Sequence, residues 1–418
     1  MRVLIALALL LPAVVHAGDV VDHYDIDVVL TPGEKKVRAE VGMKVTAPAG
    51  GLTRLDLLLN EGLEVASIES TAGKVSYRVH EDRVGFSSKA PTAMPVSIAP
   101  IPPLAAGEST TLTIVYEGTI VPDPWGLNSA GAGWVELGVF SAWFPYSEDH
   151  RNFTYDARVT IDPGFTVAGG APAGSGGGVW KLERDYETDD IVVIAARGLE
   201  ARPLEGGGSL WFLAVDEATI EQIAVDLEEM IERYGEWFGP ARIEKMDVVL
   251  AARRRGGGYQ RPGLYVTTFD GDLSRYRALM KKLSHELAHM WWTGADRTTW
   301  EDWLNEGFAE YSALLMLQAR GDSAMFAEYA QAYDHWAGSP PAIWGLDRED
   351  TRAYDALNRK GAGILYRLEQ QMGRDKFLEW CRALQKKNVV TTEEMLEVLR
   401  ISASAEAAAT VEHYLKYE

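Results

Sequence analysis

Two histidines, four residues apart, set strong limits on what this chain can fold into. The segment 281–315 reads KKLSHELAHMWWTGADRTTWEDWLNEGFAEYSALL and contains His285 and His289. Residues four apart lie on one face of a helix, so both imidazoles can bind a single metal ion with Glu286 beside them. Two neutral imidazoles suit zinc, which in a catalytic site takes a third protein ligand and keeps one position for water. The candidate third ligand is Glu306.

The residues around the histidines have a helical pattern. Leucines and a methionine form an apolar face along residues 273–292, and Gly294 is a suitable end. A second helix is predicted over residues 303–320, closed by Gly321. Because helices joined by a short loop pack together, we expect Glu306 to approach the histidines. The alternative is a chance HExxH pattern on a helix with surface or core histidines, and the second helix with its Asn-Glu pair favours zinc.

The sequence HELAHMWW followed by WLNEGFAEY closely resembles the gluzincin zinc aminopeptidases, the superfamily of alanyl aminopeptidase and leukotriene hydrolase. The resemblance implies one zinc ion per chain and a peptide substrate. It also implies that Glu306 is the third ligand, because the glutamate of the family's asparagine-glutamate-glycine motif falls there. Sixteen residues separate His289 from Glu306, two fewer than the family usually has. A shorter loop can still join the same two helices, so Glu306 remains the predicted ligand.

Two further glutamates have predicted roles at this site. Zinc lowers the pKa of bound water to about 7 and polarises a carbonyl oxygen. We expect Glu286 to act as general base toward that water and then to protonate the leaving amine. Glu310 follows Glu306 by one helical turn. It is either a hydrogen-bond acceptor that orients a zinc-binding histidine or an exposed glutamate, and the sequence leaves both interpretations open.

The predicted substrate-binding segment comprises Gly257, Gly258, Tyr259, Gln260 and Arg261. In the family a glutamate of this segment binds the free α-amino group of the substrate, and here Gln260 takes its place. Hydrogen bonds to charged groups contribute about 1.5 to 3 kcal/mol, against about 1 kcal/mol for neutral ones. We therefore expect the preference for a free N-terminus to weaken about tenfold or more. Four arginines flank the segment and are either solvated side chains at a strand edge or contacts for a substrate carboxylate. They are Arg253, Arg254, Arg255 and Arg261.

A second departure concerns the oxyanion. The family has a tyrosine two residues before a lysine-glycine pair, whose hydroxyl stabilises the tetrahedral intermediate. Here the pair is Lys360-Gly361, and Asn358 stands in the tyrosine position. Losing one such donor costs about 2.7 to 4 kcal/mol, which slows an enzyme without abolishing hydrolysis. Tyr354 and Tyr366 are candidate replacements, with Tyr354 preferred because it is one helical turn away.

The strand and helix patterns divide the chain into two parts. Within residues 18–205 apolar and polar residues alternate, as at Tyr24, Ile26 and Val28, which is typical of strands with one buried face. Residues 206–418 combine a few strands with many helical segments. We predict an α+β multidomain protein, with an N-terminal all-β sandwich-like domain followed by a mainly helical zinc-peptidase domain. By resemblance, the second domain is thermolysin-like.

The N-terminus and the overall charge indicate where the protein acts. Residues 1–17 have the charge, apolar run and small-residue end of a secretory signal peptide, with an uncleaved anchor as the alternative. We expect export to the periplasm or the cell exterior, with no integral membrane span after removal of the signal. The formal net charge of -20 argues against nucleic acid as a partner. The single cysteine, Cys381, is predicted to be buried.

The leading hypothesis is an exported zinc metallopeptidase, acting as an aminopeptidase with Glu286 as the base. One alternative is a zinc-containing peptide-binding protein with weakened catalysis. Another is an endopeptidase-like relative with a relaxed need for a free N-terminus. The intact Glu286 favours catalysis, because a structural zinc site needs neither that carboxylate nor an open ligand position. The sequence gives no indication of the oligomeric state.

Overall fold

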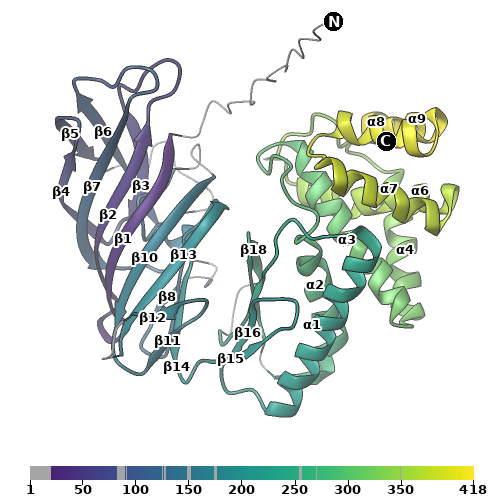
Figure 1. Ribbon diagram of the computed structural model, residues 1–418, viewed down its shortest axis with the longest axis horizontal. Helices are drawn as coiled ribbons and strands as arrows, with labels where there is room; N and C mark the ends of the chain where they lie inside the picture. Colours follow the sequence, from purple (N-terminus) through teal and green to yellow (C-terminus); the bar gives the residue numbers. More distant parts are fainter. Residues whose placement is uncertain are drawn as a thin grey trace, which may run out of the picture. The chain divides into compact units, whose positions relative to one another are not determined.

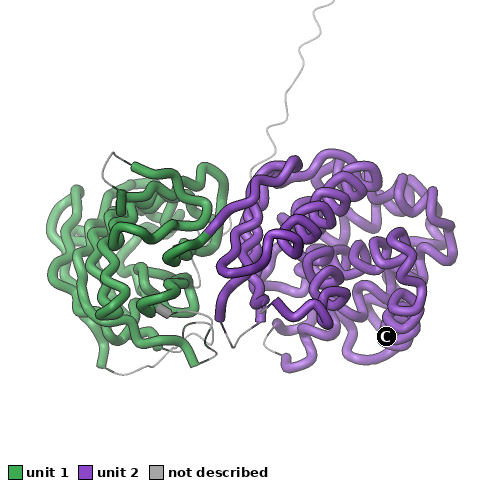
Figure 2. Tube along the Cα trace, turned by 90° about the horizontal axis from the view of Figure 1, so that it is seen from below, with its two compact units in different colours: residues 1–199 green, residues 200–418 purple. Residues whose placement is uncertain are grey.

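The computed structural model divides the chain into two compact units, Met1–Leu199 and Glu200–Glu418 (Figures 1 and 2). It describes residues 20–81, 90, 92–124, 126, 129–147, 152–173, 177–253, 257–269, 271–348 and 350–418. The predicted signal peptide, residues 1–17, lies outside the described residues. A β-rich unit followed by a mainly helical one confirms the predicted α+β architecture.

The first unit is built around a seven-stranded sheet with the order β12-β13-β10-β1-β2-β7-β4. Strands β1 and β10 are parallel, and the other neighbouring pairs are antiparallel. The predicted alternation holds in β1, where Tyr24, Ile26 and Val28 are buried between exposed residues. The strands are β1 (Val21–Thr31), β2 (Lys36–Thr46), β4 (Leu63–Ser70), β7 (Ser109–Thr119), β10 (Phe153–Ile161), β12 (Ala171–Pro172) and β13 (Val179–Thr188).

Two smaller sheets complete this unit, in the orders β11-β14-β9-β8 and β3-β6-β5. Buried aromatic residues occupy its core: Trp143 donates from Nε1 to the Ile191 carbonyl at 2.8 Å, and the Tyr116 hydroxyl donates to the Trp143 carbonyl at 2.9 Å. The remaining elements are β3 (Leu55–Asn60), β5 (Lys74–Val79), β6 (Ala93–Ile101), β8 (Ser129–Ala130), β9 (Trp134–Leu137), β11 (Phe165–Val167), β14 (Val193–Arg197) and the 3-10 turns η1 (Pro32–Glu34) and η2 (Val139–Ser141).

The second unit contains a five-stranded sheet with the order β15-β16-β17-β19-β18. Strands β16, β17 and β19 run parallel, whereas β15 and β18 pair antiparallel at the two edges. The domain boundary is predicted after residue 205. In the structure it lies after Leu199, because β15 pairs with β16 and so belongs to the second unit. The strands are β15 (Glu200–Pro203), β16 (Ser209–Phe212), β17 (Asp247–Ala251), β18 (Tyr259–Arg261) and β19 (Leu264–Thr268).

Helices make up most of the second unit. The predicted helix over residues 273–292 is shorter in the structure, because it opens with a 3-10 turn and ends at Ala288. The helical segment from Ala353 to Met372 is interrupted by a π-helical turn. The helices are α1 (Glu217–Phe238), α2 (Tyr276–Ala288), α3 (Trp303–Ala319), α4 (Ser323–Ala337), α5 (Ala353–Asp355), α6 (Gly361–Met372), α7 (Arg374–Lys387), α8 (Thr392–Ser402) and α9 (Ala405–Tyr417), with the 3-10 turns η3 (Leu273–Arg275) and η4 (Trp300–Asp302) and the π-turn η5 (Ala356–Lys360).

Helix α3 is buried on nearly all sides and lies beside α2 (Figure 1). Its backbone also touches α6: a Cβ added at Gly307 would lie 3.0 Å from the Cα of Gly361, and the reverse addition meets the same distance. Only glycines allow two helix backbones to approach this closely. This contact fixes the position of α3, and with it the preceding residue, Glu306.

Two predictions about the chain as a whole can be compared with these elements. Cys381 is buried on α7 as a free thiol, which confirms the predicted burial. Among the described residues, every helix is too short or too polar to cross a membrane.

Candidate metal and catalytic site

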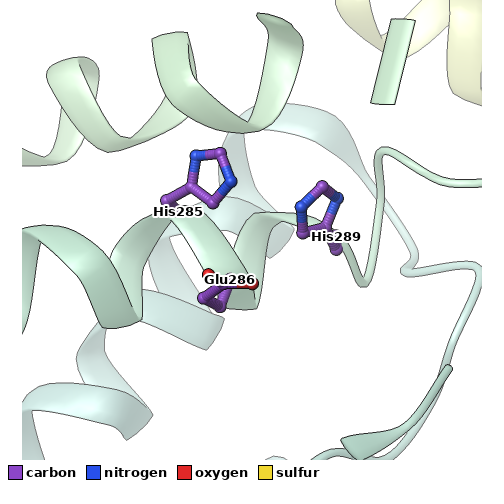
Figure 3. A group of neighbouring side chains, drawn as sticks. All are labelled: His285, Glu286 and His289. Atoms are coloured by element: carbon purple, nitrogen blue, oxygen red, sulfur yellow. The ribbon is translucent and has the colours of Figure 1, made fainter. Parts of the chain in front are cut away.

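Helix α2 carries both histidines into the core of the second unit. Leu279, Leu283 and Leu287 are buried and anchor the helix. His285 is 9% exposed and His289 is 3% exposed, with ring centroids 5.0 Å apart (Figure 3). His289 follows the last residue of α2 and caps it, but its ring remains on the same side as that of His285.

Glu306 on α3 faces both imidazoles. Its Oε2 lies 3.4 Å from Nε2 of His285, and its Oε1 lies 3.8 Å from Nε2 of His289. The structure therefore brings together the three predicted metal ligands from two neighbouring helices. Glu286 also belongs to this group, since one ligand atom from each of His285, Glu286 and His289 lies within 4.8 Å of the others.

The hydrogen bonds of the two Nδ1 atoms show that this set of ligand atoms fits zinc. Nδ1 of His285 lies 2.7 Å from a Glu310 carboxylate oxygen, and Nδ1 of His289 lies 3.0 Å from the Trp292 carbonyl. These oxygens only accept hydrogen bonds, so Nδ1 carries a proton in each ring and Nε2, on the side of Glu306, is the nitrogen that can bind a metal ion. Two oriented imidazole nitrogens and one carboxylate are a ligand set that catalytic zinc sites use.

The charges at the site also suit a cation. Burial alone would lower the pKa of His285, but hydrogen bonds with Glu306 and Glu310 outweigh it and raise the pKa to about 10. Burial lowers the pKa of His289 to about 4. Although burial opposes it, the neighbouring His289 and His285 lower the pKa of Glu306 to about 2. The site therefore gathers carboxylate charge around the two imidazoles.

Glu286 projects from α2 in a different direction from the imidazoles (Figure 3). It is half-buried, and burial raises its pKa to about 7, with the carboxylates of Glu306 and Glu310 adding to the rise. His285 and Lys282 act in the opposite direction. Glu286 is thus next to the predicted metal ligands without being oriented as they are.

Glu310 is buried, so the interpretation as an exposed glutamate is wrong. It is 6% exposed and accepts hydrogen bonds from the Lys281 ammonium and the Tyr333 hydroxyl, in addition to its contact with His285. Sequence reasoning missed both partners. Lys281 lies one turn before His285 on the same helix, which was a usable signal, whereas Tyr333 comes from α4 and gave none.

Asn305 fixes the loop that joins α2 to α3. Its Nδ2 donates to the Ala295 carbonyl at 3.1 Å and to Asp302 at 2.8 Å, and the Ala295 amide donates to its Oδ1 at 3.2 Å. This two-way pairing pins the loop to the first turn of α3. The sixteen residues between His289 and Glu306 therefore still place Glu306 against the histidines.

The three candidates for oxyanion stabilisation lie in different surroundings. Asn358 is buried in the π-turn and donates from Nδ2 to the Tyr354 carbonyl at 3.1 Å, so its amide serves its own helix. Tyr354 is 67% exposed, and its pKa is raised by desolvation and by Glu310, Glu306 and Glu286. The carboxylates of the site are therefore close enough to Tyr354 to raise its pKa. Tyr366 packs against Phe326, with ring centroids 6.5 Å apart.

The predicted substrate segment forms the edge strand β18 and its approach. Gln260 donates from Nε2 to the Arg261 carbonyl at 2.8 Å, and its Oε1 accepts from Nη2 of Arg297 at 3.1 Å. Arg297 was not foreseen as a neighbour of Gln260. The Arg261 guanidinium lies over the Tyr259 ring, 5.1 Å from its centroid. An arginine thus stands at Gln260, the residue predicted to take the place of the family's amine-binding glutamate.

An arginine and a lysine lie against the residues that precede β18, Gly257 and Gly258. Arg253 donates from Nη1 to the Gly257 carbonyl at 2.8 Å. Gly258 packs closely, since an added Cβ would lie 2.6 Å from the Val266 carbonyl and 2.8 Å from Nζ of Lys282. Arg254 and Arg255 lie outside the described residues.

Comparisons with known proteins agree with this geometry. Residues 229–414 match the Peptidase family M1 domain. Glutamyl aminopeptidase from Bos taurus is 26% identical over 225 residues, which are 49% of this chain and 23% of that protein. This chain therefore matches less than a quarter of the length of that relative.

Solved structures share the fold. An M1 zinc metallopeptidase from Deinococcus radiodurans has a TM-score of 0.69 and 24% identity, with 95% of this chain and 94% of that chain covered. Leukotriene A4 hydrolase from Saccharomyces cerevisiae has a TM-score of 0.67 and 18% identity, with 96% and 68% covered. Both structures extend the similarity beyond the second unit to nearly the whole chain.

The family match includes α2, α3 and all the predicted ligands of the single zinc ion that M1 metallopeptidases use. One conclusion follows from the motif resemblance, the converging ligands, the matching domain and the shared two-domain fold. Residues 229–414 of this chain are similar to the Peptidase family M1 domain, and nearly the whole chain shares the fold of solved M1 zinc metallopeptidases.

Proposed function

We propose that this protein is a zinc-dependent peptidase that cleaves peptides at their amino end, with Glu286 as general base. One observation carries the proposal: Nε2 of His285 and Nε2 of His289 both face the Glu306 carboxylate, with Glu286 on the next position of the same helix. Three ligands, an oriented second shell and a spare carboxylate are the parts that a hydrolytic zinc site needs.

The residues of this chain divide the work as follows. His285, His289 and Glu306 hold the zinc ion, which when bound lowers the pKa of water and polarises the substrate carbonyl. Glu310 and the Trp292 carbonyl keep the two rings in the required tautomer. Glu286 takes a proton from the attacking water and gives it to the leaving amine. Glu310 and Glu286 therefore have separate tasks, one orienting and one transferring a proton.

Tyr354 is the proposed donor to the substrate oxyanion. The amide of Asn358 is already used by the Tyr354 carbonyl, whereas the Tyr354 side chain is exposed and its pKa is raised by burial of the hydroxyl and by the carboxylates of the site. Such a donor acts on the charge that develops in the transition state, so its loss lowers the rate rather than zinc binding. Tyr354→Phe is expected to lower kcat by about 100-fold with unchanged zinc content.

A peptide substrate is supported by a relative. The Deinococcus radiodurans enzyme, in a variant with a TM-score of 0.69 and 23% identity to this chain, holds a Tyr-Ser-Ala substrate. A second candidate function is an endopeptidase-like activity with little need for a free amine. It is favoured by Arg297, whose guanidinium donates to Oε1 of Gln260 and would repel a substrate ammonium at that point.

Two measurements test the proposal. Glu286→Gln is expected to bind one zinc ion as the unchanged protein does, while peptide hydrolysis falls by about 100-fold or more. Undiminished turnover in this variant would exclude Glu286 as the base. The second measurement compares one peptide with a free and with an acetylated N-terminus: cleavage of the free form alone supports an aminopeptidase, and equal cleavage of both supports the endopeptidase-like function.

Export remains part of the proposal and rests on residues 1–17. An apolar run behind a single arginine, followed by small residues, is the pattern that signal peptidase removes. Fractionation of cells that produce the full chain, with N-terminal sequencing of the product, tests it. A mature protein that begins at Gly18 outside the cytoplasm is expected, and an intact N-terminus in the cytoplasm would refute export.

A further inference from the structure

Lys282 is a half-buried ammonium one helical turn before Glu286. Its Nζ lies 3.3 Å from the Thr267 hydroxyl and 5.9 Å from the centroid of the Tyr265 ring. Within the part of the chain that the structure describes, no carboxylate lies within ion-pair distance of it. Lys282 differs in this respect from the adjacent Lys281, which forms an ion pair with Glu310.

The ammonium of Lys282 lies against the backbone that leads into the edge strand β18. A Cβ added at Gly258 would be 2.8 Å from Nζ of Lys282 and 2.8 Å from the Tyr265 hydroxyl, so both polar groups meet at this glycine. The Tyr265 hydroxyl is buried and makes no hydrogen bond to a described residue. Hydroxyl groups can orient an ammonium, but they do not neutralise its charge.

A second cation adds to this positive charge. Burial lowers the pKa of Lys282, the Glu286 carboxylate raises it, and Arg253 lowers it again; Arg253 also donates to the Gly257 carbonyl at 2.8 Å. The chain as a whole has 61 acidic and 41 basic side chains, so positive charge beside a reaction centre is a local exception. A half-buried cation without an ion-pair partner costs folding free energy, and such groups are candidates for ligand recognition.

The position of Lys282 indicates which part of a substrate it meets. In the proposed mechanism Glu286 protonates the leaving amine, so the leaving half of the peptide lies on the side of Glu286. Lys282 precedes Glu286 by four residues on α2 and therefore lies on the same face of the helix. The leaving half of the substrate is thus the part that can reach the Lys282 ammonium.

We propose that Lys282 binds a carboxylate on the leaving half of the substrate and so determines which peptides are cleaved. The carboxylate is either the C-terminal group of a dipeptide or the side chain of an Asp or Glu that directly follows the cleaved bond. Both place the same anion opposite the ammonium. This inference rests on the proposed peptidase function and adds a substrate class to it.

The test uses two matched substrate pairs with zinc-loaded protein. One pair is Ala-Ala and Ala-Ala amide, and the other is Ala-Asp-Ala amide and Ala-Asn-Ala amide. The unchanged protein is expected to show a kcat/KM about tenfold to a hundredfold higher for the carboxylate member of at least one pair, and the pair that responds identifies the source of the carboxylate. Lys282→Met is expected to abolish this preference, and Lys282→Arg to retain most of it.

A charge control and a binding measurement make the result specific. Lys376→Met removes an exposed lysine on α7 and is expected to leave the preference unchanged. In a Glu286→Gln background, calorimetry with the same substrates is expected to show that Lys282→Met weakens binding of the carboxylate member alone. This readout decides the subsite even when no peptide is cleaved, in which case the peptidase proposal fails separately.

Two results would overturn the inference. The first is equal kcat/KM and equal affinity for both members of each pair in the unchanged protein. The second is a Lys282→Met variant that loses the same factor for all four substrates, which would make Lys282 a residue that acts through Glu286 instead.

Discussion

Substituting Glu310 by Gln tests how the second shell prepares the metal site. Glu310 is 6% exposed and accepts from Nδ1 of His285 at 2.7 Å, and also from Lys281 and Tyr333. Glutamine has the same shape and keeps one acceptor oxygen, but it lacks the charge. The contact with His285 then changes from a charge-assisted hydrogen bond to a neutral one.

The expected loss follows from that change. Charge-assisted hydrogen bonds contribute about 1.5 to 3 kcal/mol and neutral ones about 1 kcal/mol. Removing a second-shell partner of a zinc-binding histidine typically lowers metal affinity tenfold to a hundredfold. The difference of about 0.5 to 2 kcal/mol corresponds to about twofold to thirtyfold at about 1.4 kcal/mol per factor of ten, so the two ranges overlap. We therefore expect the zinc dissociation constant of Glu310→Gln to rise by about tenfold to a hundredfold.

The assay is competition for zinc between the protein and a chromophoric chelator. Tyr333→Phe is the matched control, since it removes a hydroxyl from the same carboxylate but leaves the Glu310–His285 contact, and we expect less than about a tenfold loss. Lys281 is 14% exposed in its side chain and loses its ion pair in Glu310→Gln, so chemical unfolding of the metal-free protein is measured in parallel. Unchanged zinc affinity in a folded Glu310→Gln protein would refute the reasoning.

Three further predictions concern metal, packing and pH. Zinc at 100 times its dissociation constant is expected to raise the free energy of unfolding by about 2.7 kcal/mol, and a melting temperature that does not respond to chelator would contradict the site. Gly363→Ala is expected to destabilise the fold by about 1 to 3 kcal/mol, because the added Cβ would lie 2.0 Å from the Tyr333 carbonyl. Gly235→Ala on α1 adds a Cβ in open space and is expected to stabilise the fold by up to about 1 kcal/mol. Equal urea midpoints for the two variants would contradict this prediction. Burial lowers the pKa of Lys360 from 10.5 to about 8, so between these values the unfolded chain binds more protons at this group. The contribution of Lys360 to stability therefore rises with pH in that window. In urea titrations on both sides of pH 8, Lys360→Met is expected to lose this rise of the free energy of unfolding with pH. An unchanged pH dependence would exclude Lys360 as its source.

The sequence was most informative where short-range spacing determines geometry. Helical periodicity placed His285 and Glu286 on α2, His289 at its C-terminal end and Glu306 near the start of α3, because side chains four apart share a helix face whatever surrounds them. Period-two alternation likewise marked the strands of the first unit. These features depend on local backbone geometry, and local geometry can be read from neighbouring residues.

The sequence was less informative where residues distant along the chain meet. It left the burial of Glu310 open and gave no sign of Tyr333, since both depend on how α3 and α4 pack. It also did not reveal that Arg297 would lie against Gln260. The π-turn that directs Asn358 back to Tyr354 was equally hidden, because helix periodicity assumes a regular helix.

The sequence by itself determined the proposed zinc ligands and the proposed base, which follow from spacings of a few residues, and the two-part architecture, which follows from the strand and helix patterns along the chain. Only the tertiary structure decided the orientation and charge of the site. It paired His285 with Glu310, set Arg297 at the substrate segment and left Lys282 without a carboxylate within ion-pair distance among the described residues. The physical reason is that side-chain contacts between separate elements depend on packing, and packing is a property of the whole fold.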